Sequence, residues 1–204
     1  MTEILNGVVL ANNIKRKTKT RIAKLKNPPG LAVILVGDNP ASMLYVRLKE
    51  EAAKDVGIYV EKFAYDATTS AEEIVTKITE LNARKDIHGI LVQLPLIKQD
   101  VDQVIGAIHP AKDVDGFHPL NRQALLNNAP VLVPPVALSI MRLIQATRRS
   151  LAKSTAVIVG NSEVFAEPII ELLREAGVPA TLVKRDASAL AAITRAADIV
   201  IVAV

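Results

Sequence analysis

The 204-residue sequence contains no cysteine and no tryptophan, and aromatic residues make up only 3% of it. Without cysteine, a disulfide framework and a thiolate metal site are both excluded, and a reducing cytoplasm is the natural setting. Because aromatic side chains are scarce, the core must be built from Ile, Val, Leu and Ala. Half of the residues are hydrophobic and 23% are charged, which is typical of a globular protein with a substantial core.

The sequence also lacks the features of proteins that bind membranes, metals or nucleic acids. No apolar run approaches the roughly 20 residues of a membrane span, and the N-terminus lacks the pattern of a signal peptide. His88, His109 and His118 do not have zinc-binding spacing, so we expect no metal site. The cations of residues 15–26 recur at helical spacing, and we interpret them as a solvated helix face rather than a nucleic-acid site. The net charge of +4 suits an anionic small-molecule ligand.

Strand-like and helix-like segments alternate along the chain. The predicted strands are residues 31–36, 59–65, 89–94, 155–159, 180–183 and 199–204. Helices are predicted before residue 27 and at residues 40–55, 70–83, 100–108, 136–146, 165–176 and 188–196. Such alternation favours an α/β fold with parallel sheets and right-handed crossovers.

A proline-rich stretch at residues 109–135, with one short predicted helix at 121–126, interrupts this alternation. We therefore predict two domains, a three-layer α/β domain at residues 1–135 and a Rossmann-like, doubly wound nucleotide domain at 136–204. The last apolar run is typical of a central strand buried on both faces. We expect the second domain to be incomplete and a C-terminal part to be missing.

The turn and helix after the first strand carry Tyr45 and Lys49. At positions i and i+4 these side chains share one helix face, near the edge of the sheet where ligands bind in open α/β folds. A phenol beside an amine can act as an acid–base pair. Because the same spacing occurs on many solvated helices, the pair alone does not define a site.

Longer motifs accompany this pair. GDNPAS and YVRLK lie within residues 37–49, GILVQLPL at 89–96 and PAKDVDGFHPLN at 110–121. In this order they resemble the bifunctional methylenetetrahydrofolate dehydrogenase/methenyltetrahydrofolate cyclohydrolase family, the FolD type. The resemblance is close over residues 1–125 and looser over 155–204. It implies NADP-dependent oxidation of 5,10-methylenetetrahydrofolate and hydrolysis of the 5,10-methenyl product to 10-formyltetrahydrofolate, by an enzyme that is usually a homodimer.

The resemblance also implies roles for individual residues. Lys49 would be the acid–base group that activates the ring-opening water, and Gln93 would hydrogen-bond to it. Tyr45 would stack on the folate, while Asp115 would accept hydrogen bonds from the pterin ring. The remaining residues that would shape the folate pocket are Ser42, Leu94 and Pro95.

Structural explanations stay open for several of these positions. Asp113 and Asp115 could simply stabilise the turn in which they lie. The Gln93 side chain could simply hydrogen-bond to unpaired backbone groups at the edge of the sheet. His118 matches the family without an evident catalytic role, and we interpret it as structural, whereas we interpret His88 as a surface residue.

The nucleotide motif departs from the family pattern Gly-Arg-Ser-x-x-Val-Gly-x-Pro, because residues 160–168 read GNSEVFAEP. Asn161 replaces the arginine, which removes a cation that could hold a phosphate. Ala166 replaces the second glycine and could crowd a phosphate or a neighbouring helix. We still expect Gly160, Asn161 and Ser162 to contribute to the cofactor site.

The turn after the fifth strand offers two interpretations of cofactor choice. Lys184 and Arg185 suit the 2′-phosphate of NADP, whereas Asp186 suits the ribose hydroxyls of NAD. A solvated turn explains the same residues equally well. NADP is the cofactor that we expect, with NAD as the alternative.

The intact motifs of the first domain contrast with the altered cofactor motif. We therefore expect an enzyme whose cyclohydrolase step is better preserved than its dehydrogenase step, since only hydride transfer needs the nicotinamide held against the folate carbon. The alternatives are a non-catalytic or regulatory folate- or nucleotide-binding relative and an NAD-specific variant.

Overall fold

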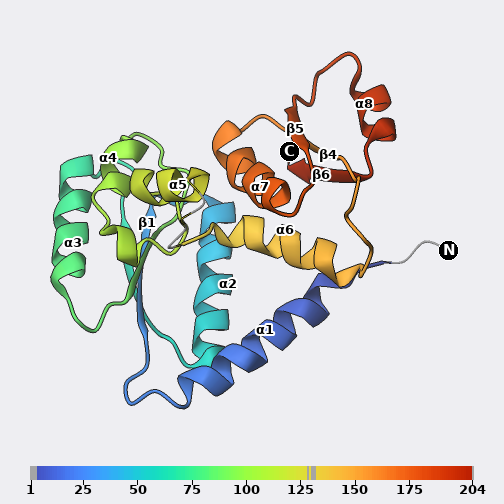
Figure 1. The fold of residues 1–204 in the computed structure, drawn as a ribbon. Helices are drawn as coiled ribbons and strands as arrows, with labels where there is room; N and C mark the ends of the chain where they lie inside the picture. The colour runs from blue at the N-terminus through green and yellow to red at the C-terminus, as the bar shows by residue number, and fades with distance from the viewer. Residues whose placement is uncertain (1–3, 128, 130–131, 204) are drawn as a thin grey trace. The chain divides into compact units, whose positions relative to one another are not determined.

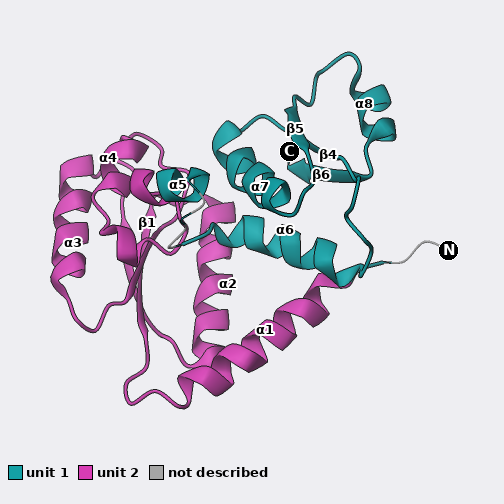
Figure 2. Cartoon of the chain, viewed as in Figure 1, with its two compact units in different colours: residues 1–5, 122–204 teal, residues 6–121 magenta. Residues whose placement is uncertain are grey.

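The computed structural model describes residues 4–127, 129 and 132–203 (Figure 1). The chain divides into two compact units, one of residues 6–121 and one of residues 122–204 with the N-terminal residues up to 5 (Figure 2). Each unit contains a three-stranded parallel sheet, which confirms the predicted α/β class. The predicted domain boundary after residue 135 stays a prediction. No helix among the described residues is long and apolar enough to cross a membrane.

In the unit of residues 6–121 the sheet order is β2-β1-β3. Its strands are β1 (Gly30–Val36), β2 (Tyr59–Tyr65) and β3 (Gly89–Val92). Its helices are α1 (Gly7–Ile22), α2 (Pro40–Val56), α3 (Ala71–Ala83), α4 (Val101–Gly106), the 3-10 turn η1 (Pro110–Lys112) and the start of α5 (Pro119–Leu126). The third strand is two residues shorter than predicted, because Pro95 has no amide hydrogen with which to continue a ladder. The helix expected at 121–126 begins earlier, with a proline in its first position.

Local capping signals explain the helix ends around the candidate site. The Asn39 side chain accepts hydrogen bonds from the backbone N–H groups of Ala41 and Ser42 and so begins α2. Gly57, with φ of 90°, ends this helix in the left-handed region that favours glycine. Ser70 caps α3 by accepting the Glu73 N–H at 3.2 Å.

The central strand β1 is buried on both faces. Ala32, Ile34 and Val36 pack in the core that includes α3 and α4, whereas Val33 and Leu35 pack in the core that includes α2 (Figure 1). Because successive side chains of a strand point to opposite faces, this alternation produces a three-layer arrangement. The carboxyl ends of β1 and β3 therefore lie at one edge of the sheet, beside α2.

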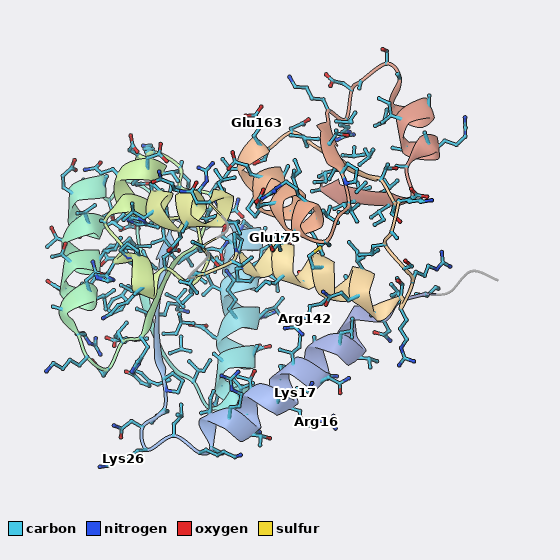
Figure 3. All side chains as sticks on the ribbon, viewed as in Figure 1. Arg16, Lys17, Lys26, Arg142, Glu163 and Glu175 are labelled. Atoms are coloured by element: carbon cyan, nitrogen blue, oxygen red, sulfur yellow. The ribbon has the colours of Figure 1, made fainter. Side chains whose placement is uncertain are left out.

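The helix α1 carries the cations that we interpret as a solvated face. Lys15 and Lys19 lie 3.4 and 3.5 Å from the Asp55 carboxylate at the end of α2. Figure 3 shows Arg16 and Lys17 extending away from the ribbon of this helix. Exposed ion pairs of this kind contribute little to stability, typically about 0–1 kcal/mol.

The second unit has the sheet order β5-β4-β6. Its strands are β4 (Ala156–Gly160), β5 (Ala180–Val183) and β6 (Ile199–Ala203), and its remaining helices are α6 (Pro135–Ala146), α7 (Glu163–Glu175) and α8 (Leu190–Ala196). Ile158 of β4 packs against Ile169 and Leu173 of α7 in a fully buried aliphatic core. The helix α7 begins two residues earlier than predicted because Ser162 caps it, and Figure 3 shows Glu163 in this first turn. The helix α8 begins two residues later than predicted.

The strand β6 corrects one expectation. A strand is present at Ile199–Ala203, but it is not buried on both faces, since Val200 is 43% exposed and Val202 is 64% exposed. Ile199 and Ile201 alternate with them and pack against the core. Among the described strands β6 pairs only with β4, so the fully buried central strand is β4 instead.

Candidate functional site

A contact between α2 and the residue that follows β3 forms the centre of the candidate site. Leu91 of β3 packs on the α2 side of the sheet, and Gln93 lies two residues further along the chain. Because side chains alternate along a strand, Gln93 also points toward α2. There Lys49 Nζ donates a hydrogen bond to Gln93 Oε1 over 3.2 Å. This is the hydrogen bond that the sequence resemblance implies.

The Gln93 side chain is held in one orientation. Its Nε2 donates to the Leu94 carbonyl oxygen at 2.7 Å, and its backbone N–H donates to the Ile34 carbonyl oxygen at 2.9 Å. Since the amide nitrogen is occupied in this way, the amide oxygen is the atom that faces Lys49. The lysine amine therefore has a neutral acceptor as its neighbour.

Asp115 reaches the same place from the segment that runs beside β3. Asp113 forms a parallel bridge with Ile90, so Asp115 lies two residues further along, level with the end of β3. Burial raises the pKa of the Asp115 carboxyl, while the Lys49 charge lowers this pKa and the Asp113 charge raises it. Lys49, Gln93 and Asp115 thus gather at one edge of one sheet.

The two neighbouring carboxylates of this segment behave differently. Asp113 is 1% exposed and accepts hydrogen bonds from the Gly116 N–H at 3.1 Å and the His118 N–H at 2.8 Å. It also accepts one from Asn121 Nδ2 at 2.9 Å. Within the described residues, Asp115 takes no part in these bonds. The turn-stabilising explanation therefore applies to Asp113, and Asp115 is left for another role.

The residues expected to shape the folate pocket lie around this cluster. Tyr45 lies one turn before Lys49 on α2 and is 58% exposed, so its ring is open to solvent. Ser42, a further turn back, is buried. Leu94 is half-buried, Pro95 is exposed, and the peptide bond that joins them is cis.

His88 and His118 both accept hydrogen bonds from backbone N–H groups. His118 is buried, and its Nδ1 accepts the Leu120 N–H at 3.1 Å. His88 is exposed, and its Nδ1 accepts the Gly30 N–H at 3.1 Å. These positions agree with a structural interpretation of His118 and a surface interpretation of His88.

Lys112 is a structurally important residue that sequence reasoning missed. Its Nζ donates to the carbonyl oxygens of Leu81, Asn82 and Arg84, at 3.1, 2.9 and 2.7 Å. These carbonyls lie at the end of α3, where backbone acceptors lack helical partners. Burial lowers the pKa of Lys112. Its place in the PAKDVDG motif could have drawn attention to Lys112, but nothing in the motif indicates where its side chain points.

The expected cofactor residues follow β4 in the second unit. Gly160 ends this strand, and a Cβ atom there would lie 2.9 Å from the Ala203 carbonyl oxygen, so packing of β6 already requires glycine. Asn161 is exposed, and the Ser162 hydroxyl accepts the Phe165 N–H at 3.2 Å. Ala166 is buried in the core of the unit, so its methyl group fills space between α7 and the sheet.

The turn after β5 lies at the same edge of this sheet. Val183 pairs with Val159, which places Lys184 level with the end of β4. Lys184, Arg185 and Asp186 are all exposed. The two cations fit the 2′-phosphate of NADP, and the carboxylate fits a ribose. The carboxyl edge of β4 and β5 is therefore compatible with a dinucleotide.

Comparison with known proteins gives two family matches. Residues 5–115 match the model of the tetrahydrofolate dehydrogenase/cyclohydrolase catalytic domain, and residues 134–204 match that of the NAD(P)-binding domain of the same enzymes. The bifunctional protein FolD of Burkholderia pseudomallei strain 1106a is 44% identical over 205 residues, which cover 98% of this chain and 72% of that protein.

Solved structures give the same result. FolD from Campylobacter jejuni is 36% identical with a TM-score of 0.93, over 98% of this chain and 73% of the other. A methylenetetrahydrofolate dehydrogenase from the silkworm Bombyx mori is 36% identical with a TM-score of 0.91, over 100% and 76%. The FolD of Trypanosoma brucei, solved with NADP and an inhibitor, is 28% identical with a TM-score of 0.94, over 99% and 71%. The chain therefore belongs to the tetrahydrofolate dehydrogenase/cyclohydrolase family.

Proposed function

We propose that this chain interconverts 5,10-methylenetetrahydrofolate, 5,10-methenyltetrahydrofolate and 10-formyltetrahydrofolate, as an NADP-dependent dehydrogenase and a cyclohydrolase. The observation that carries this proposal is the hydrogen bond between Lys49 and Gln93, with Asp115 beside it. All three residues lie within the range that matches the catalytic domain of the family or directly at its end.

The hydrolytic step needs a group that can accept a proton from water. The oxygen of a water molecule bonds to the methenyl carbon, and the neutral amine of Lys49 takes the proton that the water loses. The bond from this carbon to N5 then breaks as the new hydroxyl loses its proton to solvent and N5 takes a proton back from Lys49, and the formyl group stays on N10. Gln93 supports this role because its neutral oxygen orients the amine without the negative charge that would favour the ammonium form.

Folate recognition falls to residues around the amine. A pterin presents adjacent amide and amino donors, which the Asp115 carboxylate can accept in a bidentate manner. Tyr45 offers an open aromatic face one helical turn from Lys49, on which the rest of the folate can stack. Ser42, Leu94 and Pro95 complete the slot.

The dehydrogenase step requires the second unit. When bound, NADP supplies the acceptor for the hydride that leaves the methylene carbon. Gly160, Asn161 and Ser162 would hold the dinucleotide at the start of α7, where backbone N–H groups favour an anion. Lys184 and Arg185 would hold the 2′-phosphate. Asn161 stands where the family has arginine, so one cation of the family pattern is missing here.

Two spectrophotometric assays on the purified chain test the proposal. One follows loss of 5,10-methenyltetrahydrofolate, and the other follows NADPH formation from 5,10-methylenetetrahydrofolate, with NAD as a parallel cofactor. We expect the ratio of hydrolysis to dehydrogenation to be higher than that of the Burkholderia pseudomallei FolD assayed beside it. Equal retention of both activities would contradict this asymmetry, and folate binding without either activity would indicate a non-catalytic relative. A homodimer and a cytoplasmic location accompany the proposal as expectations.

A further inference from the structure

The buried carboxylate of Asp113 is the most highly coordinated acidic group near the candidate site. Its Oδ1 accepts the Gly116 N–H, and its Oδ2 accepts both the His118 N–H and Asn121 Nδ2. With 1% of its surface exposed, it has essentially no access to solvent or to a ligand. A buried carboxylate of this kind is tolerated because charge-assisted hydrogen bonds satisfy its oxygens.

These bonds tie down both sides of Asp115. On one side, the backbone of Asp113 bridges to Ile90, and the Val114 N–H donates to the Ile90 carbonyl oxygen at 3.5 Å. On the other side, the chain turns at Gly116, which has a φ of 73°, and both the turn and His118 are held by the Asp113 carboxylate. Asp115 therefore lies in a short span that is held at one end by backbone contacts with Ile90 and at the other by the Asp113 carboxylate.

We propose that Asp113 is a positioning residue for folate binding, whose buried carboxylate holds the turn that presents Asp115 to the pterin beside Lys49. This inference rests on the proposed function, since it assumes that Asp115 binds the pterin. Asp113 itself touches no ligand. Its effect on turnover passes entirely through the placement and the charge state of Asp115.

Charge adds a second effect to the geometric one. The charged groups that act on Asp115 are Lys49 from α2 and Asp113 from its own segment, in addition to the larger effect of burial. Because the Asp113 charge raises the pKa of Asp115, removing this charge lowers that pKa. The Asp115 pKa therefore reports the Asp113 charge, whereas KM reports whether Asp115 is still placed to bind the pterin.

The test compares Asp113→Asn with the native protein. Asparagine has the same shape as aspartate but only one acceptor oxygen. Its NH2 group would therefore face at least one backbone N–H, and two donors cannot hydrogen-bond to each other. Asn121→Ala is the milder variant, because it removes one bond to Asp113, together with one to the Pro110 carbonyl oxygen, and leaves the charge in place. Ser70→Ala, which removes the cap of α3, is the control for a general loss of stability.

Three readouts are measured on each protein: Tm, the kcat and KM for hydrolysis of 5,10-methenyltetrahydrofolate, and a 13C NMR titration of the Asp115 carboxyl without ligand. For Asp113→Asn we expect a lower Tm, a KM raised about tenfold or more with a smaller change in kcat, and a lower pKa of Asp115. Asn121→Ala should raise KM less and leave that pKa in place. Ser70→Ala should lower only Tm.

The inference is overturned if Asp113→Asn folds and leaves KM at its native value, whatever the pKa of Asp115. If Asp113→Asn does not fold, Asn121→Ala with a native KM overturns it instead. Failure of the proposed function looks different, because the native protein would then lack hydrolysis while the NMR titration still reported the effect of Asp113 on Asp115.

Discussion

Lys49 Nζ and Gln93 Oε1 lie 3.2 Å apart, joining the middle of α2 to the residue that follows β3. The two residues are 44 positions apart in the chain, and they meet because parallel strands bring their carboxyl ends to one edge of the sheet. The acceptor in this pair is neutral, so Gln93 orients the amine without adding a negative charge beside it.

Gln93→Glu tests the importance of this neutrality. A carboxylate at this position would form an ion pair with Lys49 and favour its protonated form, which cannot accept a proton from water. We expect cyclohydrolase kcat near neutral pH to fall about 100-fold or more, with partial recovery as the pH rises. A pH profile of hydrolysis measures this, with exposed Gln123→Glu as the charge-matched control. An unchanged profile would show that Gln93 does not tune the amine.

Asp115→Asn should change stability in a pH-dependent way. Burial raises the pKa of Asp115 above its ordinary value of 3.8, so the folded protein binds this proton more tightly than the unfolded chain. Native stability therefore falls as the pH rises from about 3.8 through the raised pKa, and asparagine avoids this loss. The variant should gain Tm relative to the native protein between pH 4 and pH 7, whereas exposed Asp66→Asn should not. A gain that shrinks with rising pH would contradict the assigned cause.

Lys112→Met should destabilise the first unit without removing any group from the folate slot. The ammonium group satisfies three carbonyl oxygens at the end of α3, and methionine leaves them without this donor. We expect a loss of about 1–3 kcal/mol in the free energy of unfolding, measured by urea denaturation. Lys98→Met, an exposed lysine of the same unit, is the control and should stay within about 0.5 kcal/mol of the native protein.

Much of the fold follows from local signals that the sequence displays openly. The strand at 59–65 and the helix opened by Ser70 have the predicted limits, because capping and turn residues act over a few positions. The meeting of Lys49 with Gln93 was expected from the family resemblance, and the parallel connectivity that brings both segments to one sheet edge accounts for it. The chemical roles of these residues were expected from family resemblance and stay predictions.

Other features depend on contacts that no local pattern encodes. Asp113 and Asp115 have the same side chain two residues apart, and only the folded turn shows that the first is enclosed by donors. Lys112 reaches carbonyls about 30 residues earlier in the chain, which no periodicity indicates. The strand β6 has the composition of a buried strand, yet only Ile199 and Ile201 pack against the core, and Val200 and Val202 on the opposite face are exposed.

Hydrolysis by Lys49→Met tests the central claim most directly. The purified variant and the native protein are compared for hydrolysis of 5,10-methenyltetrahydrofolate and, by calorimetry, for binding of 5-formyltetrahydrofolate. Lys54→Met, an exposed lysine near the end of the same helix, serves as the control. We predict that Lys49→Met loses hydrolysis by at least about 1000-fold while its folate Kd stays within about tenfold of native. Native rates of hydrolysis in this variant would contradict the assignment of Lys49 as the acid–base group.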